Sequence, residues 1–232
     1  MFKLFAAALI LSLVAAPAHA EGPAFVTPNQ SQATLILLDP PADGSPEQQA
    51  ELAGLHAMES SRTAAQEEAA KADAKDKSIF VFRTVFGEAF AAKNLPLTAA
   101  LGEKIARDSG ENVRVTKDYF KRIHPYTIDA TLHPVCTSND KPESYPSGHA
   151  LLGWVMGLTL VEMVPEQREA ILLRAQDYGH NRLVCGVHYP SDIAASRPLA
   201  YAIHALMTQN PDYVAQVAAA RAELRKALNL AD

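Results

Sequence analysis

Three short stretches of the sequence combine residue types that could bind an anion and act on it. The stretch SYPSGHA (144–150) brings Ser147, Gly148 and His149 to the start of a long apolar segment. A proline fixes its own backbone angle, and a glycine lets an anion approach the backbone closely. The free N–H groups at a helix start carry the positive end of the helix dipole. This stretch predicts an anion site with a histidine beside it, although an ordinary serine cap before a core helix has the same pattern.

The second stretch, HNRLVCGVHYPSD (180–192), spaces an arginine, a histidine and an aspartate. His188 follows Arg182 by six residues and precedes Asp192 by four. The Tyr-Pro-Ser turn at 189–191 repeats that at 145–147, so a second helix is expected there with Asp192 in its first turn. Asp192 could then accept a hydrogen bond from one nitrogen of His188 and leave the other free. A neutral, oriented imidazole is a nucleophile; the alternative is a purely structural histidine–carboxylate pair.

The third stretch, KDYFKRIHPY (117–126), places Lys117 on an expected helix, with His124 and Pro125 just past its end. A lysine alone is usually a solvated charge, so only its combination with the other two stretches points to a site.

Together the three stretches resemble the type 2 phosphatidic acid phosphatase (PAP2) superfamily, which includes bacterial class A nonspecific acid phosphatases and vanadium haloperoxidases. The superfamily pattern is Lys-x6-Arg-Pro, then Pro-Ser-Gly-His, then Ser-Arg-x5-His-x3-Asp. Order and spacing agree with it across about seventy-five residues, and the flanking regions resemble class A acid phosphatases most. The matching residues are Lys117-x6-His124-Pro125, Pro146-Ser147-Gly148-His149 and Asn181-Arg182-x5-His188-x3-Asp192.

The resemblance implies a role for each residue. His188 would attack phosphorus to give a phosphohistidine, Asp192 would orient it, and His149 would protonate the leaving alcohol and then activate water. No cofactor or metal is implied, and the sequence has no close His/Cys/Asp cluster at metal spacing. The groups expected to hold the phosphoryl oxygens are Lys117, His124, Ser147, the Gly148 N–H and Arg182.

Two positions depart from the superfamily pattern. Asn181 replaces a serine, which is mild because either side chain can hydrogen-bond an oxygen. His124 replaces an arginine, so a permanently charged fork becomes an imidazole with fewer donors. A neutral His124 should weaken transition-state binding by roughly 1.5 to 3 kcal/mol. We hypothesise that low pH, or bound phosphate itself, restores the charge.

The N-terminal residues 1–20 have the pattern of a secretory signal peptide. Lys3 precedes an apolar run, and Ala18-His19-Ala20 resembles a cleavage site; an N-terminal membrane anchor is the weaker alternative. The expected mature domain, residues 21–232, would be periplasmic or secreted, without stable membrane insertion. The formal net charge of −5 and the lack of any Lys/Arg run give no sign of nucleic-acid binding.

Export also bears on the two cysteines, Cys136 and Cys185. An oxidising compartment favours a disulfide between them, worth roughly 4 kcal/mol in the chain-entropy account, with two buried thiols as the alternative.

The fold expected from the pattern is an all-α, single-domain helical bundle, with a central helix over 149–164 that is apolar on all sides. No strand alternation persists, and a homo-oligomer is compatible with the sequence. Residues 21–46 are Pro-rich with little helical pattern, ending in a capped helix start at Ser45. The other expected helices cover 46–73, 78–90, 95–110 with a stop at Gly110, 111–123 with a stop at Pro125, 165–182, 191–209 and 211–230.

The sequence therefore predicts an exported, metal-independent acid phosphatase acting on small phosphate monoesters. One alternative is a vanadate-dependent haloperoxidase, because the same anion site would hold vanadate. The other is a degenerate protein that only binds phosphate, because of His124.

Overall fold

The computed structural model describes residues 22–136 and 142–231, so the predicted signal peptide lies outside it. These residues form helices and connecting loops, with no strand beyond a single bridge between Ile123 and Glu143. The expected all-α architecture is therefore confirmed. The main helices are α3 (Pro46–Ser61), α4 (Ala64–Lys75), α6 (Pro96–Phe120), α8 (Gly148–Met163), α9 (Arg168–Val184), α10 (Pro190–Met207) and α11 (Pro211–Ala227).

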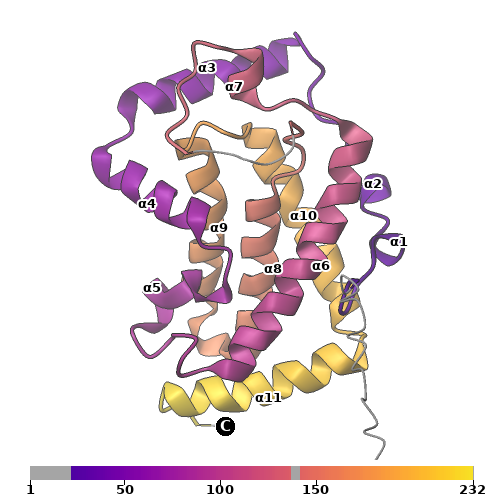
Figure 1. Cartoon of the computed structure of the whole chain (residues 1–232), viewed down its shortest axis with the longest axis vertical. Coiled ribbons are helices and arrows are strands. Elements are labelled where there is room, and N and C mark those ends of the chain that lie inside the picture. Colours follow the sequence, from indigo (N-terminus) through magenta and orange to yellow (C-terminus); the bar gives the residue numbers. More distant parts are fainter. Residues whose placement is uncertain (1–21, 137–141, 232) are drawn as a thin grey trace, which may run out of the picture.

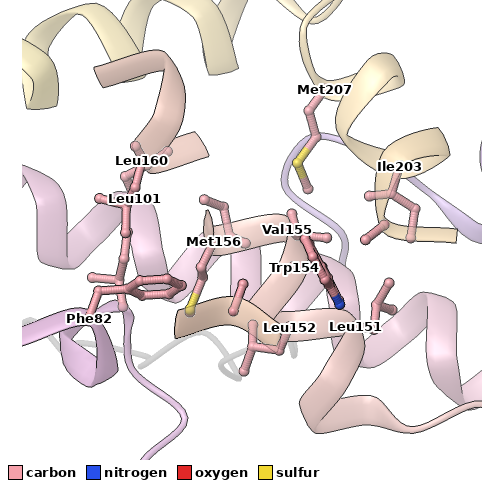
Figure 2. Packing of buried hydrophobic residues seen from close by; sticks show 14 of the residues in the cluster. Phe82, Leu101, Leu151, Leu152, Trp154, Val155, Met156, Leu160, Ile203 and Met207 are labelled. Carbon is pink, nitrogen blue, oxygen red and sulfur yellow. The ribbon is translucent and has the colours of Figure 1, made fainter. Parts of the chain in front are cut away.

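Helix α8 runs through the middle of the bundle and packs against α6, α9, α10 and α11 (Figure 1). Thirteen of its sixteen residues are buried, as its uniformly apolar sequence predicts. Small residues let α9 come close: a Cβ on Gly153 would lie 2.6 Å from a ring carbon of Tyr178. Figure 2 shows how Phe82, Leu101, Met156 and Leu160 fill the space on one side of α8. This packing fixes the helix whose first turn carries Gly148 and His149.

Helix α6 was expected to end at Gly110, and this expectation is wrong. The helix is 25 residues long and continues through Gly110 to Phe120, and Lys121 in the left-handed conformation ends it. A glycine in a helix interior costs only about 0.5 to 1 kcal/mol relative to alanine. Buried residues on both sides of it, Ile105 and Val113, hold the two halves against the same core. The helix also ends at Phe120, about one turn before the expected end at Ile123.

The N-terminal part differs from its expected pattern in three places. The segment read as non-helical contains two short helices, α1 (Pro28–Ser31) and α2 (Ala33–Ile36). The helix expected over 46–73 is two helices, because Thr63 starts α4 with a capping box; Ser45 caps α3 as expected. The apolar 78–90 stretch makes only a 3₁₀ turn (Ile79–Phe82) and the one-turn helix α5 (Arg83–Phe86). Helix α4 lies against the side of α9, and α3 crosses the upper end of the bundle in Figure 1, where it contacts the end of α9.

Helices α8 and α10 begin side by side and are tied together at their first residues. The N–H of Ser147 donates to the carbonyl oxygen of Asp192 at 3.1 Å. The Ser196 hydroxyl is 2.9 Å from both the Ser147 and the Asp192 carbonyl oxygens. Because one helix start carries His149 and the other carries Asp192, these bonds join the two predicted halves of the site.

The predicted disulfide is present. Cys136 and Cys185 are bonded, and they join the loop after α7 (Pro125–Ile128) to the end of α9. The same loop also pairs through its backbone, since the Val135 N–H donates to the Cys185 carbonyl oxygen at 3.0 Å. The link lies three residues before His188, so it steadies the turn that presents this histidine.

Candidate active site

A cavity of about 270 Å³ opens where α6 passes the first turn of α8. Four of the predicted site residues line it: Lys117, Gly148, His149 and His188. They come from the three separate stretches of sequence that the motif pattern picked out. The remaining lining residues are Lys77, Ala106, Ser109, Gly110, Val113, Arg114 and Leu152.

His188 is held by a fully buried carboxylate. Its Nδ1 lies 3.0 Å from Oδ2 of Asp192, which also accepts the N–H of Tyr189 at 3.0 Å. Asp192 is the third residue of α10, as predicted. Because the carboxylate takes the proton-bearing Nδ1, the lone pair of Nε2 remains for chemistry in the cavity. Burial lowers the pKa of His188 well below its ordinary value, and positive charge on His124 or Lys117 lowers this pKa further. The imidazole is therefore neutral, which is the form that can act as a nucleophile.

His149 faces His188 from the other helix start. It is 7% exposed, and its Nε2 lies 3.2 Å from the carbonyl oxygen of Ala74. Burial first, and then the charges of Arg182 and Lys77, lower the pKa of His149 to about 2. Negative charge on a bound phosphoryl group would act in the opposite direction and favour the protonated ring. A bound anion would therefore favour the protonated form of His149.

Gly148 is the first residue of α8, and the fold itself does not require a glycine there. A Cβ built on it would meet only Val113 Cγ1 at 3.6 Å, which is an ordinary contact. Its φ is not positive either, because only Gly44, Gly87 and Gly186 among the described glycines have a positive φ. What a side chain would change is the cavity, which Gly148 lines. The bare backbone at the helix start suits close approach of an anion.

Two cations belong to the same site. Lys117 lies in the last turn of α6, and its Nζ donates to the Glu143 carbonyl oxygen at 2.6 Å. Arg182 is 3% exposed near the end of α9, where one of its N–H groups is 3.6 Å from the Cys185 sulfur. Both charges lower the pKa of His188. The site is electropositive although the whole chain is acidic.

His124 lies beside His188 and is not one of the residues that line the cavity. Its Nδ1 is 2.6 Å from the Val187 carbonyl oxygen, so Nδ1 carries the proton and donates it. Its Nε2 is buried and has no hydrogen-bond partner among the described residues. The ring stacks on Tyr126 and meets His188 edge-on. Burial is the largest cause that lowers the pKa of His124, so the neutral ring keeps a lone pair on Nε2.

Two other sequence expectations are placed differently. Ser147 is fully buried and caps α8, accepting the Ala150 N–H at 3.4 Å, and it does not line the cavity. Asn181 donates to Asp73 at 2.7 Å and so faces the α4 side. Three further histidines pair with carboxylates: His56 with Asp129, His133 with Glu59 and His204 with Glu162.

Sequence reasoning missed two residues behind Asp192. The NH1 group of Arg122 donates to Asp192 Oδ1 at 2.7 Å. Its NH2 donates to Glu51 of α3, also at 2.7 Å. The only sequence signal for Arg122 was its place two residues before His124, and Glu51 had none because it lies far away on a different helix.

The described residues contain no cluster of three or more His, Cys, Asp or Glu side chains arranged to hold a metal ion. Nor does any helix within residues 22–136 and 142–231 combine the length and apolar character needed to cross a membrane. What the residues bring together is an imidazole oriented by a carboxylate, a second imidazole whose protonation a bound anion would favour, and cationic and N–H donors. This set suits nucleophilic displacement at an anionic group.

Comparison with known proteins agrees with this geometry. Residues 95–215 match the sequence model of the PAP2 superfamily. A non-specific acid phosphatase of Providencia stuartii is 33% identical over 153 residues, covering 62% of this chain and 60% of that protein. An acid phosphatase of Zymomonas mobilis subsp. mobilis is 36% identical over 138 residues, 57% of this chain and 52% of that protein. The chain thus spans about three fifths or less of these relatives.

The fold is similar to the crystal structure of a bacterial vanadium-dependent iodoperoxidase. The TM-score is 0.58 at 16% sequence identity, and the match covers 84% of this chain and 58% of the iodoperoxidase. At this identity the similarity concerns the fold alone.

Proposed function

The chain belongs to the PAP2 superfamily, and we propose that it is an acid phosphatase that hydrolyses small phosphate monoesters through a phosphohistidine intermediate. The observation that carries the proposal is the His188–Asp192 pair at 3.0 Å beside a cavity that His149 and Gly148 also line. The acid phosphatases that the chain resembles, at 33% and 36% identity, support the choice of reaction.

The first half of the reaction breaks the ester bond. Nε2 of His188 forms a bond to phosphorus while the P–O bond to the alcohol breaks, and His149 gives its proton to the leaving oxygen. The positive charge that appears on the His188 ring is balanced by ionised Asp192. Lys117, Arg182 and the Gly148 N–H stabilise the charge on the phosphoryl oxygens.

The second half returns the enzyme to its starting state. His149, now neutral, takes a proton from water while the water oxygen attacks phosphorus. The P–N bond breaks, inorganic phosphate is released, and His188 regains its Nε2 lone pair. No step in this scheme uses a metal ion.

His124 gives the proposed enzyme a specific pH dependence. Its Nε2 lone pair cannot donate to a phosphoryl oxygen, but it can accept the proton of a phosphate monoanion, or bind the dianion after protonation. Either way one extra proton is bound together with the phosphate. We expect this requirement to place the pH optimum of activity in the acid range, because low pH favours protonation of His124 or of the bound phosphate.

We also propose that the protein is exported, with residues 1–20 removed and residues 21–232 as the mature domain in the periplasm or the medium. The Cys136–Cys185 disulfide supports this, because such bonds persist in oxidising compartments. N-terminal sequencing of the protein from a periplasmic fraction, with Glu21 as the expected first residue, tests it. Recovery of an intact Met1 from that fraction would contradict it.

The deciding experiment is hydrolysis of p-nitrophenyl phosphate across pH 4 to 8 in the presence of a chelator. His188→Ala is the test variant, and His180→Ala is the matched control, because His180 is an exposed histidine outside the cavity. We expect chelator-resistant activity that is lost only in His188→Ala, together with an acid-labile, alkali-stable phosphoenzyme in rapid-quench samples. Activity that survives in His188→Ala would exclude the phosphohistidine route.

Two other functions make different predictions in the same assays. A vanadate-dependent haloperoxidase, which could use the same anion site for vanadate, would oxidise bromide or iodide when vanadate and peroxide are added. A degenerate phosphate-binding protein would bind inorganic phosphate in calorimetry but form no phosphoenzyme. The identity to proteins named acid phosphatases favours the hydrolase over both.

A further inference from the structure

We propose that Arg122, anchored by Glu51 of α3, is a positioning residue that keeps Asp192 ionised and aimed at His188. The inference rests on the proposed function, since it concerns the same histidine. It adds two residues that lie outside the motif positions, and one of them, Glu51, lies outside the part of the chain that matches the superfamily.

The contacts form a continuous chain of charge-assisted hydrogen bonds. Arg122 uses NH1 for Asp192 Oδ1 at 2.7 Å and NH2 for Glu51 Oε2 at 2.7 Å. The other oxygen of Asp192 is left for His188 Nδ1 at 3.0 Å. The Arg122 side chain is 2% exposed and that of Asp192 is 0% exposed, so water does not screen this pair. Each carboxylate oxygen of Asp192 thus has a fixed role.

Arg122 is itself held in place from several sides. Its guanidinium lies 3.8 Å from the centre of the Tyr189 ring and donates to the Ser191 hydroxyl at 2.6 Å. Glu51 closes the arrangement, because its other oxygen accepts the Ser191 N–H in the first turn of α10 at 2.7 Å. Glu51 therefore satisfies a free helix N–H and fixes the arginine in one step. Helix α3 crosses near the start of α10 in Figure 1.

Asp192 needs such a partner. A fully buried carboxylate tends to take up a proton, and burial raises the pKa of Asp192 even with Arg122 present. A protonated Asp192 could not balance the positive charge of a phosphohistidine. Arg122 is the largest influence that opposes protonation, ahead of the Tyr189 N–H and the Ser144 hydroxyl. The other titratable groups whose charge acts on Asp192 or is affected by it are His124, Tyr145, His188 and Tyr189.

Arg122→Gln and Arg122→Lys test the proposal in the full chain. Without the arginine charge the Asp192 carboxyl should protonate at higher pH. We expect kcat of Arg122→Gln to fall by about 10- to 100-fold, with a small change in KM and an acid limb that moves to higher pH. Arg122→Lys keeps the charge but lacks the planar guanidinium that holds Asp192 and Glu51 with separate N–H groups, so it should restore the acid limb and only part of kcat.

Glu51→Gln should act with the opposite sign on the pH profile. It removes a negative charge behind the arginine, so the acid limb should stay or move to lower pH, while kcat falls slightly because Arg122 loses an acceptor. Arg225→Gln is the matched control: Arg225 is another buried arginine, paired with Glu166 next to the C-terminal end of α8. That end is roughly 22 Å from the first residue of α8. Arg225→Gln should lower the melting temperature without moving the pH profile of activity.

A measurement that does not depend on turnover separates this inference from the proposed function. Carbon-13 NMR of the aspartate carboxyl carbons, with Asp192→Asn to assign the signal, follows the ionisation of Asp192 directly. We expect its titration to shift to higher pH in Arg122→Gln only. Unchanged titration with an unmoved acid limb would overturn the inference, even in an active enzyme. A wild-type protein without a phosphoenzyme would overturn the proposed function, while the NMR result would still decide the role of Arg122.

Discussion

The ring of His124 meets the ring of His188 edge-on, with centroids 5.0 Å apart and an angle of 61° between the planes. Both rings are almost fully buried, at 1% and 3% exposure. Two buried imidazoles at this separation disfavour each other's protonation, and His124 is the largest electrostatic cause that lowers the pKa of His188. A permanently charged arginine at this position would disfavour protonation of His188 as well, so what the histidine removes from the site is one permanent positive charge.

Replacing His124 by arginine should raise activity and flatten its pH dependence. The charge-assisted contact would no longer require a proton, so kcat/KM at pH 7 should rise by about 10- to 100-fold, corresponding to roughly 1.5 to 3 kcal/mol. The gain should shrink toward pH 5. Steady-state kinetics with p-nitrophenyl phosphate checks this; an equal change at all pH values would contradict the role given to His124.

Replacing His149 by asparagine should lower kcat by an amount that depends on the leaving group of the substrate. An alkoxide needs the proton that His149 supplies, so kcat for an alkyl phosphate should fall by about 10²- to 10⁴-fold. Nitrophenolate leaves without a proton, and the loss of the first step should be smaller for its ester. Parallel kinetics with glycerol phosphate and p-nitrophenyl phosphate give the comparison. Equal losses with both would mean that His149 is not the acid.

Gly148→Ala should leave the fold intact but weaken phosphate binding. The added methyl group meets only Val113 Cγ1 at 3.6 Å, so the melting temperature should change little. It narrows the cavity at the helix start, and displacement of the phosphoryl group should lower kcat/KM on the order of 100-fold. Gly54→Ala on α3, where a Cβ meets nothing within 4 Å, is the matched control and should keep full activity.

The buried histidines should make stability depend on pH. The pKa values of His124, His149 and His188 all lie below the ordinary 6.5, so below that pH the unfolded chain binds protons that the folded chain does not. The free energy of unfolding should fall as pH drops from 6.5, by on the order of 1 kcal/mol per pH unit for each such imidazole. Raised pKa values of Asp108 and Asp192 act in the opposite direction.

Urea unfolding at several pH values, with and without inorganic phosphate, measures this slope. Phosphate favours protonated rings and should reduce the slope, and His149→Asn should reduce it without phosphate. A slope that neither phosphate nor this substitution alters would show that other groups dominate.

Reduction of the Cys136–Cys185 disulfide should destabilise the chain. The bond joins two cysteines that are 49 residues apart in sequence, and the loop-closure entropy gives a contribution of roughly 4 kcal/mol to the free energy of unfolding. Cys136→Ser with Cys185→Ser should lower the melting temperature by about 8 to 16 °C. Because the bond lies close to His188, activity at a temperature well below unfolding should also fall. Calorimetry and kinetics of the double variant check both.

The sequence predicted the central parts of the molecule better than its margins. Helix α8 is apolar on every side, and α10 begins with a proline and an aspartate, so their character and start were evident from the residues. The Gly110 stop failed because the cost of one glycine is small beside the packing of the helix around it. The division between α3 and α4 was missed because alanine and glutamate favour helix on both sides of Thr63.

The site shows a similar contrast. The contact between His188 and Asp192 could be predicted because short-range spacing brings the aspartate to a histidine one turn away. Arg122 and Glu51 could not, since their meeting depends on how α3 lies against the start of α10. No local pattern encodes that placement. The direction of the Asn181 side chain, toward Asp73, likewise depends on a helix that is distant in sequence.

The bonds between Ser147, Asp192 and Ser196 have a consequence for how this architecture can vary. They fix the starts of α8 and α10, which carry His149 and Asp192, directly against each other. The hairpin of α8 and α9 connects these two points in the chain, and its length does not affect the contacts between them. Insertions or deletions at the far turn, around Pro165–Gln167, should therefore leave the reacting geometry unchanged. The same chemistry can thus be carried by chains of quite different length.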